Sequence, residues 1–183
     1  MKRMIVMLMA SAFLAAACSK DKYQANPDGS TPVLYPRSSI FAWPVVDGAH
    51  QEPNGKARIY LDQTAKLSTD FQAGDGVRVG ARSAIGEDAV LFPNATVGND
   101  TSIGKDVIVQ SDVKIGNNVS IGKDSVIGQG TTIEDGARIG RWVKIGPRAS
   151  IGSSAEIGGA ATVGDGATVA KNQRVAQGEH VTK

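Results

Sequence analysis

The sequence predicts an all-β solenoid in which short strands wind into stacked triangular coils. From Val79 to Val181 every sixth residue is aliphatic, through eighteen positions with no change of phase. Glycine follows twelve of these eighteen residues, and a short side chain stands two places before each except at Gln173 and Glu179. A period of six fits neither a helix nor a plain strand. It fits an alternation of inward and outward side chains, followed by a corner that Gly, Asn or Asp can turn.

Three such hexads would make one triangular coil of 18 residues. Coils of this kind stack at the spacing of paired strands, roughly 4.8 Å. Residues 77–183 then give about six coils, and periodicity of this strictness is typical of a solenoid. Leu61 and Leu67 keep the same phase further upstream. We therefore expect the coiled segment to occupy residues 59–183.

The hexads V-S-I-G-K-D at 119–124, S-V-I-G-Q-G at 125–130 and A-T-V-G-D-G at 161–166 carry a resemblance to a known family. They resemble the bacterial hexapeptide-repeat family. The resemblance implies a left-handed parallel β-helix, with the handedness taken from the family rather than from the period. It also implies a homotrimer. Most members are acyltransferases in which a histidine acts as general base between neighbouring prisms.

The N-terminal segment predicts export. Lys2 and Arg3 precede an apolar run over 4–17 that is short for a membrane span and typical of a signal peptide. The stretch L-A-A-A-C, which ends at Cys18, resembles the lipobox of bacterial lipoproteins. That resemblance implies cleavage after residue 17 and lipid, including palmitate, on Cys18. The alternative is a plain signal peptide cleaved nearby.

The following segment, residues 18–58, is interpreted as a lipid-anchored tether and a proline-rich docking segment. Ser19 after the cysteine favours the outer membrane in the lipoprotein family, with the protein facing the periplasm. Five of the seven prolines lie between Pro27 and Pro53. Within this region Phe41 and Trp43 belong to an apolar cluster that we expect to dock onto another surface.

The charge of the exported chain argues against nucleic acid as a partner. Loss of residues 1–17 removes Lys2 and Arg3 and no acidic residue, which leaves 18 basic and 18 acidic side chains. A neutral chain with mixed charges lacks the basic patch that binds phosphate backbones.

Candidate catalytic residues are few. The two histidines are His50, before the repeats, and His180, four residues from the end. No histidine lies between residues 51 and 179, and no loop interrupts the hexads. A zinc site of three histidines is excluded on the same count. We predict no cofactor and regard His180 as a weak candidate only.

One face of the predicted prism is apolar. On an 18-residue register Val90, Ile108 and Val126 stack outward, with Phe92 beside the first and Trp142 at the corner that leads into this face. Such a patch is usually covered. The occupant stays open between the chain's own docking segment, a second subunit and a separate partner.

One corner stacks acidic residues. Asp88, Asp106 and Asp124 recur every 18 residues, so their carboxylates could hold a hard cation such as calcium. Aspartate is also common at corners because it tolerates turn conformations. We favour the turn interpretation.

These observations favour an envelope lipoprotein whose rigid β-helical rod is a non-enzymatic binding or assembly scaffold. Its partners would be the membrane, through Cys18, and an unidentified envelope protein or glycan. The alternative is an acyltransferase-like enzyme with an atypical active site near His180 or His50.

Overall fold

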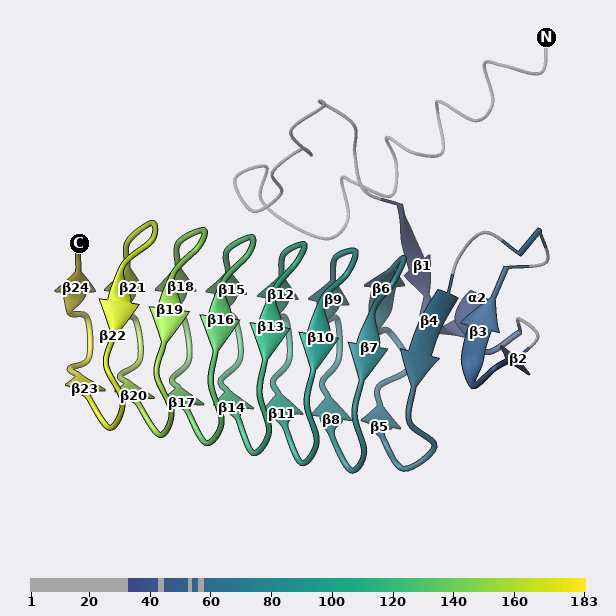
Figure 1. Ribbon diagram of the computed structural model, residues 1–183, viewed down its shortest axis with the longest axis horizontal. Coiled ribbons are helices and arrows are strands. Elements are labelled where there is room, and N and C mark those ends of the chain that lie inside the picture. The colour runs from purple at the N-terminus through teal and green to yellow at the C-terminus, as the bar shows by residue number, and fades with distance from the viewer. Residues whose placement is uncertain (1–32, 43–44, 53, 56–57) are drawn as a thin grey trace, which may run out of the picture. The chain divides into compact units, whose positions relative to one another are not determined.

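The computed structural model describes residues 33–42, 45–52, 54–55 and 58–183. Over this part of the chain three β-sheets form the faces of a parallel β-solenoid (Figure 1). The predicted fold class is therefore confirmed. The only helix in these ranges, α2 (Arg37–Ile40), has four residues. No helix among the described residues is long and apolar enough to cross a membrane.

The strands fall into three sheets, named A, B and C. Sheet A contains β1 (Leu34–Pro36), β6 (Gln72–Gly74), β9 (Val90–Leu91), β12 (Ile108–Val109), β15 (Val126–Ile127), β18 (Lys144–Ile145), β21 (Thr162–Val163) and β24 (His180–Val181). Sheet B contains β2 (Val45–Val46), β3 (Ala49–Gln51), β4 (Arg58–Leu61), β7 (Arg78–Val79), β10 (Thr96–Val97), β13 (Lys114–Ile115), β16 (Thr132–Ile133), β19 (Ser150–Ile151) and β22 (Thr168–Val169). Sheet C contains β5 (Lys66–Leu67), β8 (Ala84–Ile85), β11 (Ser102–Ile103), β14 (Ser120–Ile121), β17 (Arg138–Ile139), β20 (Glu156–Ile157) and β23 (Arg174–Val175).

Each coil pairs with the next through parallel strands 18 residues apart. Thr96 pairs with Lys114, and Val97 with Ile115. The first coil begins at β4, so sheet C holds seven strands and the solenoid has seven coils rather than the six expected over 77–183. The additional coil keeps the phase at Leu61 and Leu67. Its pattern is less regular than that of the later coils, because Phe71 fills a position that short side chains occupy later.

The coils wind in the left-handed sense that the resemblance implied. In Figure 1 the sheet B strands from β4 to β22 face the viewer and run downward, while the coils advance from right to left. This winding is opposite to the usual right-handed crossover between parallel strands. Each connection here is a short corner rather than a helix packed on a sheet, so the packing reason for right-handed crossovers does not apply.

The interior is a continuous aliphatic core. The aliphatic residue of each hexad points inward, and Leu91, Ile127 and Ile151 are completely buried. The short residue two places earlier also points inward, and Val107 and Ala137 are equally buried. This arrangement confirms the inward pattern read from the sequence. Core residues pack coil against coil, so each coil is stabilised mainly by its neighbours.

Four buried polar residues, Ser83, Thr101, Ser125 and Thr131, occupy the short interior position. Each hydroxyl donates to a carbonyl of the next coil; that of Ser125 donates to the Gly140 carbonyl at 3.0 Å. The Ser125 oxygen also accepts from the Val143 N–H at 3.1 Å. The hydroxyls therefore join successive coils inside the core without leaving a buried polar atom unpaired.

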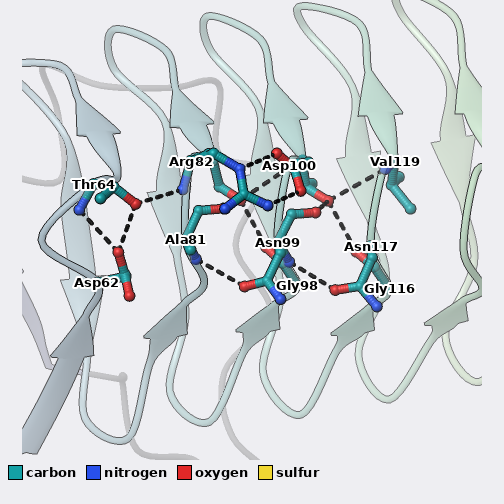
Figure 2. A network of polar contacts seen from close by, with 12 residues as sticks. Asp62, Thr64, Ala81, Arg82, Gly98, Asn99, Asp100, Gly116, Asn117 and Val119 are labelled. Carbon is teal, nitrogen blue, oxygen red and sulfur yellow. Dashed lines mark hydrogen bonds and ion pairs between the residues drawn. The ribbon is translucent and has the colours of Figure 1, made fainter.

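The corners between sheets B and C are joined by a ladder of side chains (Figure 2). Asn99 accepts from the Ala81 N–H at 2.8 Å, and Asn117 accepts from the Asn99 N–H at 2.8 Å. Asp135 continues the ladder by accepting from the Asn117 N–H at 2.7 Å. Short side chains with acceptor oxygens at these positions thus satisfy backbone groups that the strands leave unpaired.

The N-terminal end of the solenoid is covered by β1, α2 and the β2–β3 hairpin (Figure 1). Strand β1 pairs antiparallel with β6, and β3 pairs antiparallel with β4. Ile40 and Ile59 are completely buried within the core. Burial raises the pKa of the Tyr35 phenol, and the carboxylates of Glu52 and Asp75 raise it further. This cap protects strand edges that would otherwise pair with other chains.

At the opposite end, two residues that break the short-residue rule satisfy backbone groups. Gln173 accepts from the Ala170 N–H at 2.7 Å, and Glu179 accepts from the Ala176 N–H at 2.6 Å. In the preceding coil the matching Gly152 N–H donates to the Val169 carbonyl of the next coil. Gln173 and Glu179 therefore take over the acceptor role in the last coil.

We predict that Ser125→Ala destabilises the solenoid by about 1–3 kcal/mol, because the buried Val143 N–H loses its acceptor. The measurement is the free energy of unfolding from denaturant titration. Ser120→Ala is the matched control, since Ser120 lies on the exposed outer face of sheet C and its loss should cost less than about 0.5 kcal/mol. Equal effects of the two substitutions would contradict the interior role of Ser125.

Candidate functional site

The two histidines lie at opposite ends of the coil order. His180 is exposed on β24, the last strand of sheet A. His50 lies on β3 in the N-terminal cap, with its ring centroid 5.1 Å from that of Phe41. Its Nδ1 is buried and has no hydrogen-bond partner. The structure does not bring the two histidines into one site.

The residues expected on an apolar face lie on sheet A in the predicted register. Val90 pairs with Ile108, which pairs with Val126. Val90 and Ile108 are buried with exposures of 4% and 3%, Phe92 is also buried, and Val126 is half-buried. Trp142 is separate from this group, because 52% of it is exposed. These four residues thus form a covered face, whereas Trp142 faces solvent.

Of the expected docking segment, the structure describes Phe41 but not Trp43, which lies outside the described residues. Phe41 directly follows α2 and is 48% exposed. The Arg37 guanidinium lies 4.8 Å from the Phe41 ring centroid. Cys18, the candidate lipidation site, also lies outside the described residues.

The three corner aspartates adopt the left-handed conformation, with φ of 52° at Asp88, 56° at Asp106 and 59° at Asp124. Asp88 and Asp124 each face a lysine, Lys105 at 3.7 Å and Lys123 at 3.8 Å. Within the described ranges no cluster of three or more acidic, histidine or cysteine side chains could hold a metal ion. The geometry agrees with the turn role of aspartate.

A hollow of about 480 Å³ opens on sheet C near its C-terminal end. Outward side chains of β17, β20 and β23 and the corner residues that follow these strands line it. These corners, which lead from sheet C into sheet A, are called the C–A corners. The polar lining consists of Arg138, Glu156, Arg174 and Gln177. The hollow thus combines hydrogen-bond donors and acceptors on a rigid surface.

Charge pairing organises this hollow. Arg138, Glu156 and Arg174 are stacked in register on successive strands. The Arg174 guanidinium donates to one Glu156 oxygen, and Arg138 lies 4.0 Å from the other. Two cations thus share one carboxylate, and the guanidinium side chains stay 75% and 77% exposed. The spare donors can bind an anionic group of a ligand.

Glycine gives the hollow its depth at one C–A corner. A Cβ on Gly158 would lie 2.5 Å from the Gln177 nitrogen, so close packing between coils requires glycine there. A Cβ on Gly159 would meet nothing closer than the Arg141 carbonyl oxygen at 3.3 Å. The backbone therefore tolerates a side chain at position 159 far better than at 158. Gly159 leaves space that the fold itself does not need.

Sequence reasoning overlooked this hollow because its members follow the repeat without exception. Arg138, Glu156 and Arg174 occupy outward positions, where the repeat pattern alone predicts an ordinary solvent-exposed surface. The 18-residue spacing placed them in one row, but it gave no sign that Gly159 would open a recess beside them. The doubled glycine at 158–159 was the signal available.

Comparisons with known proteins support the family resemblance. The family model described as bacterial transferase hexapeptide (six repeats) matches residues 94–129, 112–147 and 124–159. This match supports the hexapeptide-repeat family for that part of the chain. No protein with curated annotation matches the sequence.

Solved structures share the fold. The acetyltransferase domain of PglB from Neisseria gonorrhoeae in complex with acetyl coenzyme A is 23% identical, with a TM-score of 0.60 over 63% of this chain and 55% of that one. A hexapeptide transferase family protein from Anaplasma phagocytophilum is 22% identical, with a TM-score of 0.51 over 68% of this chain and 73% of that one. The chain spans just over half of the PglB domain structure. At these identities the likeness establishes the fold.

The prediction of a non-enzymatic scaffold is wrong in the light of these comparisons. The matching family model is one of transferases, and the two similar structures are an acetyltransferase domain and a hexapeptide transferase family protein. The findings favour the alternative, an acyltransferase-like enzyme. The unbroken repeats misled the interpretation because a site on a solenoid can be assembled from outward side chains of adjacent coils, without any inserted loop.

We predict that Gly158→Ala and Gly159→Ala differ sharply in stability. The first places a methyl group against backbone atoms of the next coil and should cost about 1–3 kcal/mol. The second should change stability by less than about 0.5 kcal/mol, since the equivalent corners carry side chains such as Lys123 and Arg141 and the nearest atom, the Arg141 carbonyl oxygen at 3.3 Å, needs only a small shift. Thermal melts followed by circular dichroism compare the two variants. A larger loss at position 159 would contradict the packing described.

Proposed function

We propose that this protein is an acyltransferase-like enzyme of the hexapeptide-repeat type. The observation that carries the proposal is that the family match and the hollow involve the same residues. The transferase family match runs to residue 159, and its last segment contains Arg138, Glu156 and Gly158 of the hollow. The same surface therefore carries both the transferase sequence pattern and an open recess with spare donors.

The recess suits an acyl donor that bears anionic groups, such as an acyl thioester of a phosphorylated carrier. Arg174 would hold phosphate oxygens of the donor through charge-assisted hydrogen bonds. Arg138 lies on β17 and Arg174 lies on β23. The coil register, rather than a loop, therefore sets the position of each arginine. Rigid placement of this kind is what positioning of two reactants requires.

His180 is the residue that we assign as general base. It follows Gln177 of the hollow by three residues, so the two Cα atoms lie at most about 11 Å apart. Its ring is exposed and can meet an acceptor bound at the recess. In the reaction it would take the proton of an acceptor hydroxyl or amine as that group attacks the thioester carbonyl. The donor thiolate then leaves and receives the proton.

The test is acceptor-dependent release of thiol from acetyl coenzyme A. Cys18 is the only cysteine, so the full chain carrying Cys18→Ser contributes no thiol of its own to a colorimetric assay. We expect release with hydroxyl- or amine-bearing sugars, and a fall of about 10²-fold or more in His180→Asn. His50→Asn is the matched control and should stay within about twofold. Acceptor-independent signal alone, or full activity in His180→Asn, would contradict the assignment.

We also propose that the chain is anchored in the cell envelope by lipid on Cys18. The support is the position of Cys18 directly after the apolar segment 4–17 and the resemblance of the preceding residues to a lipobox. A chain anchored in this way would work at a membrane surface.

Substitution Cys18→Ser should move the protein expressed in a bacterial host from the detergent phase to the aqueous phase in a Triton X-114 partition, because the lipid can no longer be attached. Ser19→Ala is the control and should remain in the detergent phase. Aqueous partition of the unmodified chain would show that the signal is a plain one.

A further inference from the structure

Trp142 occupies a position where the fold gains nothing from an aromatic ring. It sits at a C–A corner with a φ of 59° and is 52% exposed. The equivalent corners of the other coils carry short side chains or none: Asp88, Asp106, Asp124, Ala160 and Gly178. Left-handed backbone is uncommon for a bulky residue, and outliers of this kind gather at functional sites. The exposed ring is therefore available to a ligand.

Two cations lie beside this ring. The Lys123 ammonium nitrogen is 5.6 Å from the ring centroid, and the Arg141 guanidinium carbon is 5.5 Å from it. Cation–π contacts of this length orient an indole without covering it. Both cations lie over the ring, yet the ring stays 52% exposed, so it forms an aromatic surface with positive charge close to it.

A notch adjoins the aromatic corner. The residue that precedes the left-handed position is long in five of the other six coils: Glu87, Lys105, Lys123, Arg141 and Gln177, while the first coil has Thr69 at the equivalent place. Only position 159 holds glycine, between Arg141 and Gln177. Arg141 and Gln177 are two coils apart, which is roughly 10 Å at the spacing of paired strands. Gly159 lines the hollow already described, so the notch opens into it.

The chemistry of this surface fits a sugar. One face of a sugar ring is made of C–H groups that pack on an aromatic ring, and its hydroxyls both donate and accept hydrogen bonds. Arg138 and Arg174 donate, Glu156 accepts, and Gln177 does both. An apolar ligand would instead strip water from these charged groups without replacing their hydrogen bonds.

The charge of the surface indicates an anionic sugar. Lys123, Arg138, Arg141 and Arg174 bring four positive charges against the three carboxylates of Asp124, Glu156 and Glu179, the last of which accepts from the Ala176 N–H of the hollow at 2.6 Å. Arg138 lies four residues before Trp142, within about 14 Å along the chain. A ligand stacked on Trp142 can therefore place a carboxylate or phosphate near a guanidinium.

We propose that Trp142 and the notch at Gly159 bind an anionic saccharide, the acceptor of the acyl group. As an acceptor site it rests on the proposed function, but binding of the saccharide does not require the acyl donor. The proposal assigns stacking to Trp142, space to Gly159, and recognition of the anion to Arg138, while Arg174 stays with the acyl donor.

The test is calorimetric titration of the full chain carrying Cys18→Ser, without any acyl donor, with trigalacturonate, glucose 6-phosphate and neutral cellotriose. Trp142→Asn removes the ring and keeps the corner, because Asn94, Asn118 and Asn172 adopt the same left-handed conformation. Arg148→Asn is the matched control at another such corner, where φ is 57°. Gly159→Gln fills the notch with the side chain found at position 177. Thermal melts accompany each titration.

We expect trigalacturonate to bind and its affinity to fall at least tenfold in Trp142→Asn and in Gly159→Gln, with unchanged affinity in Arg148→Asn. The melting temperature should be unchanged or higher in both asparagine variants. Binding of glucose 6-phosphate that depends on Trp142 would support the proposal with phosphate as the anion. Binding of that compound without dependence on Trp142 would reveal a bare anion site and overturn it.

Equal affinity for cellotriose, or no binding of either acidic compound, would also overturn the proposal. These outcomes are separable from failure of the proposed function. Saccharide binding without thiol release would leave the site standing and contradict the enzyme. Thiol release with other sugars, in the absence of acidic-saccharide binding, would support the enzyme and contradict the saccharide site.

Discussion

The structure depends on one constraint, the fixed advance of 18 residues from each coil to the next. Backbone groups pair only with the coil above and the coil below, as when the Gly80 N–H donates to the Val97 carbonyl. One residue more or fewer in a corner would turn every later side chain to the opposite face. Because the length of each coil is fixed in this way, equivalent residues stack in straight rows. Those rows create both the core and the outer surface.

The same constraint explains the corners. Each corner must turn the chain from one sheet to the next within a few residues, and from Gly76 to Gly178 it does so with one residue in the left-handed conformation, such as Asp106, Asn118 or Gly136. Successive coils pack so closely that a Cβ at Gly158 would collide with the backbone of the next coil. Where a corner residue departs from these requirements, the fold supplies no reason for it. Trp142 and Gly159 are two such departures at the C–A corners of adjacent coils, and Gly159 lines the hollow.

The candidate site also follows from the stacking of rows. Arg138, Glu156 and Arg174 are far apart in the sequence, yet the register places them side by side on sheet C. A site of this kind needs no inserted loop and no break in the repeat. It is rigid because each contributing side chain stands on a strand paired on at least one side. The ends of the solenoid are closed by different means, the N-terminal cap and the side chains of Gln173 and Glu179.

The sequence by itself determined the strands, the inward and outward positions and the three faces, because a period of six repeated without error allows only one register. Only the tertiary structure decided that Val90 and Ile108 are covered while Trp142 is exposed, and that Gly159 opens a recess. The physical reason is that burial and empty space depend on side chains from neighbouring coils. A repeat pattern shows which of these side chains are aligned, but not how much of the space between coils they fill.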